Sequence, residues 1–182
     1  MDHRSPAPRD SAGFTLVELL IVVSIIGIVS TIAIAGYRHA RISGSEATAI
    51  AGLRSIHDAQ FAFAQTCGNQ RFSATLAGLA VPVPSTGHAF LSPDLAVDPA
   101  LKGGYQFVMD GPAPPPEELP REACNGVGTV TEYRVTADPL NPGVSGSRFF
   151  GTNKDRTIFA DTASFSEDMP HSGAPGHGAE IK

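Results

Sequence analysis

An apolar run from Phe14 to Ala35 constrains the fold of this chain more than any other feature. Glu18 is the only charged side chain among its 22 residues. As a helix rising 1.5 Å per residue, the run would be about 33 Å long, which is enough to cross the hydrocarbon core of a bilayer. A carboxylate in such a segment costs about 2.5–3.5 kcal/mol on insertion scales. We therefore expect a membrane-spanning helix whose one acid needs a positively charged partner.

The rest of the chain has the composition of a loop-rich folded domain. The protein has 182 residues, of which 17% are charged, and it contains 19 glycines and 15 prolines. This composition favours one domain with short strands over a helical bundle. The net charge of −5 argues against nucleic acid as a partner.

An ordinary secretory signal peptide is one alternative for the N-terminal segment. Ala33-Ile34-Ala35 has the small-x-small pattern of a cleavage site. Against this alternative, the apolar run is longer than the usual core of about 7–15 residues, and it carries Glu18 near its start. The charges that flank the run do not decide its orientation, because two arginines precede it and two follow it (Arg4 and Arg9, then Arg38 and Arg41).

The start of the run carries a specific resemblance. The sequence Gly13-Phe14-Thr15-Leu16-Val17-Glu18, followed by the apolar residues, resembles the leader junction of type IV pilins and pseudopilins. The resemblance implies that a prepilin peptidase cleaves between Gly13 and Phe14 on the cytoplasmic side, and that the new amine of Phe14 is methylated. It also implies a single-pass protein of the bacterial inner membrane, with its N-terminus in the cytoplasm.

The same resemblance implies the partners and the final location. Before assembly the subunit would lie in the lipid bilayer, and an inner-membrane assembly platform would then add it to a filament in the periplasm or on the cell surface. Copies of the chain and other pilins would be its neighbours. The expected function is that of a structural subunit of a type IV pilus, with a pseudopilin of a type II secretion system as the alternative.

Glu18 has a physical role in this interpretation. Cleavage after Gly13 would create a cationic amine slightly more than one helical turn away from Glu18. In a filament the carboxylate would meet the amine of a neighbouring subunit inside an apolar core. Removing one half of a buried pair leaves an uncompensated charge and costs roughly 3–5 kcal/mol, so the pair would favour correct register between subunits.

The expected fold is α+β, with one long N-terminal helix packed on a small antiparallel sheet, as in pilins. From Tyr37 to Gln65 there is no proline, and apolar residues recur at three- and four-residue spacing. The expected organisation is a leader at 1–13, a transmembrane and assembly helix at 14–36, an amphipathic continuation at 37–66, a globular head at 67–163 with about four strands, and a flexible tail at 164–182.

Four segments of the head have strand-like patterns. They are Gly104–Met109, Thr129–Thr136, Ser147–Phe150 and Arg156–Ala160. We expect a turn at Asp138-Pro139 and Asn141-Pro142-Gly143, and a hairpin connection at Gly151–Asp155. The amphipathic half of the helix would cover the apolar face of this sheet.

The chain has two cysteines, Cys67 and Cys124. If the head lies outside the cytoplasm, a single disulfide between them is the better expectation, and otherwise they would be free thiols. Their spacing does not match a zinc site. A bridge that closes a loop of this length contributes about 4 kcal/mol in the chain-entropy model.

No catalytic residue, metal site or cofactor is expected. The sequence contains no nucleophile elbow, phosphate loop or HExxH pattern. His57 and Asp58 are adjacent, and neighbours in a helix do not face each other. The resemblance to pseudopilins, some of which bind calcium through a C-terminal loop, suggests Asn153, Asp155 and Asp161 as ligands, but the sequence has no EF-hand-like pattern there. A signal-anchored periplasmic enzyme or binding domain remains the alternative from another class.

Overall fold

The computed structural model describes residues 13–112 and 121–181 of the chain. The expected leader therefore lies outside the described residues, except for Gly13. The chain divides into two compact units, Met1–His39 and Ala40–Lys182. The architecture is α+β, as the sequence predicts, with a long N-terminal helix and an antiparallel sheet.

Helix α1 extends from Leu16 to Thr66 and contains no proline. Its side chains in the first unit are mostly exposed, whereas its part in the second unit has one buried face. The chain leaves the helix through Asn69 and Gln70, which have φ angles of 51° and 65°. Asparagine tolerates this left-handed conformation better than most residues, so Asn69 suits the end of the helix.

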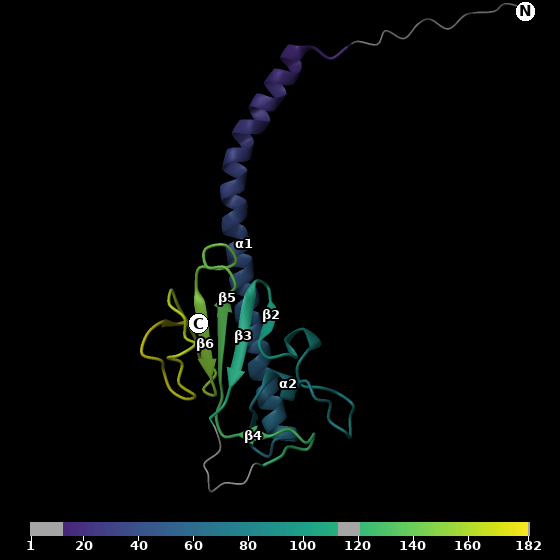
Figure 1. Cartoon of the computed structure of the whole chain (residues 1–182), viewed down its shortest axis with the longest axis vertical. Coiled ribbons are helices and arrows are strands. Elements are labelled where there is room, and N and C mark those ends of the chain that lie inside the picture. The colour runs from purple at the N-terminus through teal and green to yellow at the C-terminus, as the bar shows by residue number, and fades with distance from the viewer. Residues whose placement is uncertain (1–12, 113–120, 182) are drawn as a thin grey trace, which may run out of the picture. The chain divides into compact units, whose positions relative to one another are not determined.

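Over the described residues, the head contains a six-stranded antiparallel sheet in the order β2-β3-β5-β6-β7-β8, and β1 and β4 form a separate two-stranded sheet. The sheet therefore has more strands than the expected four. Figure 1 shows β2, β3, β5 and β6 of the large sheet beside one another. The large sheet consists of β2 (Ala100–Lys102), β3 (Tyr105–Asp110), β5 (Arg134–Pro139), β6 (Phe149–Asn153), β7 (Ile158–Asp161) and β8 (Ala179–Ile181). The remaining short elements are β1 (Phe72–Ser73), α2 (Leu76–Leu79), η1 (Pro93–Leu95) and β4 (Thr129–Val130).

The expected single strand at Thr129–Thr136 is wrong. The chain leaves β4, which pairs with β1, and enters β5, which pairs with β3 and β6, so the two halves belong to different sheets. Of the turn expected at Asp138-Pro139 and Asn141-Pro142-Gly143, the first part is wrong, because Asp138 and Pro139 lie in β5. Pro139 is tolerated there because its pairing is with Tyr105 alone, beyond the last residue that pairs with β6. The chain does turn at the second part, where the amides of Val144 and Ser145 donate to the Asn141 carbonyl.

The connection between β6 and β7 is shorter than expected. Gly151 to Asn153 belong to β6, and the chain turns through the next four residues, with Arg156 at a φ of 68°. The segment 164–182, expected to be a flexible tail, includes β8, which pairs with β7. Phe165 and Met169 in this segment are buried with Phe159 in a second apolar cluster. Phe165 and Met169 therefore pack the segment against Phe159 of β7, although its glycine and proline content suggests a flexible tail.

The main core lies between α1 and one face of the sheet. Tyr105, Phe107 and Met109 of β3 are buried together, as the alternating pattern predicts. The ring of Phe107 approaches α1 at Gly52, where a Cβ would lie 2.7 Å from the ring. A larger residue at that position would push the helix away from the sheet.

Several polar side chains also fix α1 to the head. Glu46, which the apolar pattern places off the buried face, is buried and accepts hydrogen bonds from the Ser147 amide and hydroxyl at 3.0 and 2.7 Å. Arg148 forms an ion pair with the same carboxylate. Burial alone would raise the pKa of Glu46, but these hydrogen bonds lower it overall. Further along, the amide of buried Gln60 bonds both the backbone NH and the carbonyl of Ser73.

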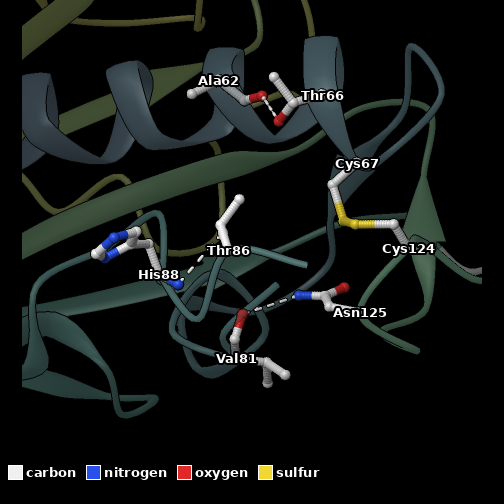
Figure 2. Close-up of a disulfide and its surroundings, with 8 residues drawn as sticks. All are labelled: Ala62, Thr66, Cys67, Val81, Thr86, His88, Cys124 and Asn125. Atoms are coloured by element: carbon white, nitrogen blue, oxygen red, sulfur yellow. Dashed lines mark hydrogen bonds between the residues drawn. A yellow bond between two sulfur atoms is a disulfide. The ribbon is translucent and has the colours of Figure 1, made fainter. Parts of the chain in front are cut away.

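A disulfide joins Cys67 at the end of α1 to Cys124 (Figure 2). The same two residues share a backbone hydrogen bond of 3.1 Å from the Cys124 amide to the Cys67 carbonyl. Asn125 donates a side-chain hydrogen bond to the carbonyl of Val81 (Figure 2). The bridge thus ties the helix end to a segment that also contacts the loop after α2.

His57 is a buried histidine on the sheet-facing side of α1. Its Nε2 lies 2.7 Å from Thr152 Oγ1, and this hydroxyl donates its own proton to the Thr157 carbonyl. His57 Nε2–H must therefore be the donor to Thr152. Burial, with a smaller contribution from Arg156, lowers the pKa of His57 from 6.5 to about 4. The imidazole is neutral in the folded protein near pH 7.

This pKa shift predicts a pH dependence of stability. As the pH is lowered from 6.5 to about 4, the unfolded chain gains a proton at His57 that the folded chain excludes. The free energy of unfolding should therefore decrease by about 2 kcal/mol as the pH is lowered over this range. In His57→Gln, which can still donate to Thr152, this part of the pH dependence should disappear. Urea unfolding of the full chain in detergent, compared between the two proteins at each pH, measures it. Equal slopes for both proteins would contradict the assignment.

Candidate functional site

The expected cleavage junction between Gly13 and Phe14 lies outside regular secondary structure. Gly13, Phe14 and Thr15 precede α1, and the Phe14 side chain is 79% exposed. A Cβ added at Gly13 would meet no atom of the described residues within 4 Å. Packing against the described residues therefore does not explain this glycine.

Thr15 and Glu18 form a reciprocal cap at the start of α1. The Glu18 carboxylate accepts hydrogen bonds from the Thr15 amide at 3.2 Å and from the Thr15 hydroxyl at 2.9 Å. The Thr15 hydroxyl oxygen in turn accepts from the Glu18 amide at 3.2 Å. This is a capping box, in which two backbone NH groups at a helix N-terminus find partners. The pattern T-x-x-E at Thr15 and Glu18 is a sequence signal for such a box, and the junction motif alone does not assign Thr15 this capping role.

The cap gives Glu18 partners without neutralising its charge. Both of its partners are uncharged groups of Thr15, and no ion pair involves Glu18 in the described part of the chain. The positive end of the helix dipole contributes some further stabilisation at this position. The carboxylate thus remains available to a cation from another molecule.

The apolar side chains that follow are uncovered. The most apolar window of α1 has a mean hydropathy of 2.7, and none of it is buried. α1 is long and apolar enough to cross a membrane. Ser24 and Thr31 donate their hydroxyl protons to the carbonyls of Leu20 and Ile28, both at 2.7 Å, so their polar groups are satisfied within the helix. The segment fits a membrane-anchored precursor, because water would have to solvate its whole apolar surface.

The head keeps the two residues of the histidine–aspartate pair apart. His57 is buried against Thr152, whereas Asp58 lies on the surface, 3.4 Å from Arg156. An open groove of about 770 Å³ runs along α1. Seven of its ten lining residues are apolar, and its polar side chains, Arg54, Ser55 and Asp58, all come from α1. Such a surface does not gather the convergent polar groups of a small-molecule site.

The oxygens weighed for calcium are used within the chain. The Asn153 Oδ1 accepts from the Asp155 amide at 3.0 Å, and an Asp155 carboxylate oxygen accepts from the Gly173 amide. Asp161 pairs with His177 at 2.7 Å. Over residues 13–112 and 121–181, no group of three or more His, Cys, Asp and Glu side chains could hold a metal ion.

Comparison with known proteins assigns the N-terminal segment. Residues 8–34 match the family model described as the prokaryotic N-terminal methylation motif. This motif is the signature of type IV pilins and pseudopilins, and it implies processing by prepilin peptidase and assembly into pilus-like filaments. It points to a structural subunit and not to an enzyme. A comparison with curated proteins gives no match.

The cap predicts a local effect of Thr15→Val. Loss of the hydroxyl removes two of the three hydrogen bonds in the capping box, and losing an N-cap typically costs about 1 kcal/mol. Hydrogen exchange of the amides at Glu18 and Leu19 should therefore accelerate about five-fold in detergent micelles, as NMR can measure. Thr31→Val removes a hydroxyl from the middle of the same helix and should leave these amides unchanged. Equal exchange in wild type and Thr15→Val would exclude the cap.

Proposed function

We propose that this chain is the structural subunit of a type IV pilus. A prepilin peptidase cleaves it between Gly13 and Phe14, the new Phe14 amine is methylated, and the bilayer holds the subunit until an inner-membrane platform assembles it. Copies of the chain, with other pilins, pack their apolar helices together in the filament. The observation that carries the proposal is Glu18 beside the junction, as the one acid of an apolar run whose side chains are uncovered.

Glu18 would exchange partners during assembly. In the single subunit the Thr15 cap supplies hydrogen bonds to the carboxylate, but it supplies no positive charge. Cleavage after Gly13 places a cationic amine on Phe14, next to Thr15. In the filament the amine of a neighbouring subunit pairs with Glu18, and this pair gains strength as lipid and water are excluded.

The structure of the head supports a role as a rigid unit. Hydrogen bonds of Glu46, His57 and Gln60 tie α1 to the segment before β6, to β6 and to β1, and a disulfide fixes the end of the helix. A disulfide suits the oxidising environment outside the cytoplasm. A head of this kind can be displayed on a filament without a further partner to complete its fold.

Gly13→Leu should block maturation. The structure gives Gly13 no packing role, so the side chain would act on the peptidase and not on the fold. Intact mass spectrometry of the membrane protein should show the full-length chain in place of a methylated chain beginning at Phe14. Gly36→Leu makes the same change where a Cβ also meets no atom within 4 Å, and it should mature normally. A Gly13→Leu product that begins at Phe14 would exclude the assigned junction.

Glu18→Ala and Glu18→Gln should insert and lose the leader, but they should assemble poorly. Loss of a charge pair worth roughly 3–5 kcal/mol predicts a fall in filament yield of at least about a hundred-fold. Glutamine keeps an acceptor for the Thr15 cap, so its failure would isolate the charge as the cause. Glu167→Ala, which removes an exposed acid of the head, is the matched control. Sheared filaments measured by immunoblot give the yield, and a normal yield from Glu18→Gln would contradict the proposed pairing.

A pseudopilin of type II secretion would carry the same N-terminal segment, so the kind of filament needs its own experiment. Deletion of the gene should remove surface filaments and leave protein secretion intact. Loss of secreted proteins without loss of surface filaments would assign the chain to the secretion system instead.

A further inference from the structure

One turn of α1 directly after the apolar run differs from the rest of the surface. Tyr37, Arg38, His39 and Arg41 follow Gly36, and all four side chains are exposed. Between Glu18 and Glu46 the sequence contains no acid, and Glu46 is already engaged by Ser147 and Arg148. The turn is therefore a basic segment without an acidic neighbour of its own.

Most other cations of the described chain have partners. Lys102, Arg134, Arg148, Lys154 and Arg156 each form an ion pair with an acid. Arg71 and Arg121 also have interactions. Within residues 13–112 and 121–181, Arg38, Arg41 and Arg54 are the basic side chains left without an ion pair or hydrogen bond.

The positions of Arg38 and Arg41 oppose the expected orientation. Loops on the cytoplasmic side of a membrane helix carry the excess of arginine and lysine. With the leader in the cytoplasm, these two arginines lie on the translocated side and cancel the bias from Arg4 and Arg9. Two unpaired arginines that weaken the insertion signal call for a separate physical reason.

We propose that the Tyr37–Arg41 turn binds anionic phospholipid headgroups, and that this contact holds the unassembled subunit at its depth in the bilayer. The inference rests on the proposed function, because it requires the apolar run to lie in the membrane. A guanidinium matches a phosphate group through two parallel hydrogen bonds. Tyrosine is enriched at the membrane–water interface, where its ring lies at the headgroup level. Assembly into a filament then requires the subunit to give up these headgroups.

The test uses the whole mature protein, beginning at Phe14, in mild detergent. It is offered equal amounts of phosphatidylglycerol and phosphatidylcholine. Native mass spectrometry gives the ratio of the two bound lipids. Wild type should prefer phosphatidylglycerol, and each of Arg38→Gln and Arg41→Gln should reduce the preference by about five-fold, with the double variant close to no preference. Arg54→Gln is the matched control, because it removes another unpaired arginine of α1 far beyond the apolar run, and it should keep the wild-type ratio.

Three outcomes would overturn the proposal: no preference in wild type, an equal loss in Arg54→Gln, or a double variant that loses filaments while keeping its lipid preference. The last result would assign the arginines to an acidic surface of a neighbouring subunit. Leader removal and filament yield of the wild type are measured in parallel. Normal maturation with no lipid preference would reject this inference alone, whereas absence of cleavage at Gly13 would reject the proposed function.

Discussion

The carboxylate of Glu18 is the constraint on which the rest of the molecule depends. An apolar helix without this acid would be stable in a bilayer, because lipid solvates such a surface fully. Lipid chains provide no cation for the carboxylate, so the membrane leaves this one side chain without a charged partner. Thr15 supplies hydrogen bonds to the carboxylate, yet hydrogen bonds from neutral groups leave the charge uncompensated. In the proposed function, the helix can therefore remain in the bilayer before assembly, and its Glu18 would gain an ion pair from a neighbouring subunit.

Two glutamates on α1 show how context decides the fate of a charge. Glu46 is buried in the head, where Ser147 and Arg148 complete its coordination within one chain, and its pKa falls. Glu18 is exposed, and its partners in the described chain are the uncharged groups of Thr15. The first glutamate contributes to the fold of the single subunit. The second has no charged partner in the described chain, and in the proposed filament a neighbouring subunit would supply one.

The features that could be predicted from the sequence are those with strong local signals. The apolar run, the junction pattern and the alternating strand around Phe107 each depend on a few consecutive residues. The break between β4 and β5 could not be predicted, because Thr129–Thr136 reads as one continuous strand and only pairing with distant segments divides it. β8 has three residues, which are too few for a periodic pattern, and its pairing with β7 defines it. The capping role of Thr15 could have been predicted from the T-x-x-E pattern, but the charge of Glu18 in an apolar run is the more prominent feature.

The contacts between α1 and the head occur along the whole buried part of the helix. Glu46, His57 and Gln60 are fixed by hydrogen bonds at three different turns, and Cys67 is fixed by a covalent bond at the end. Close packing, as where the Phe107 ring meets α1 at Gly52, resists a shift of the helix through its shape. Directional bonds add to this resistance, since a shift of one residue would break all of them together. In the proposed filament, a load on α1 would therefore be shared between β6 and the segment before it, through His57 and Glu46, and the far end of the head, through Gln60 and the disulfide.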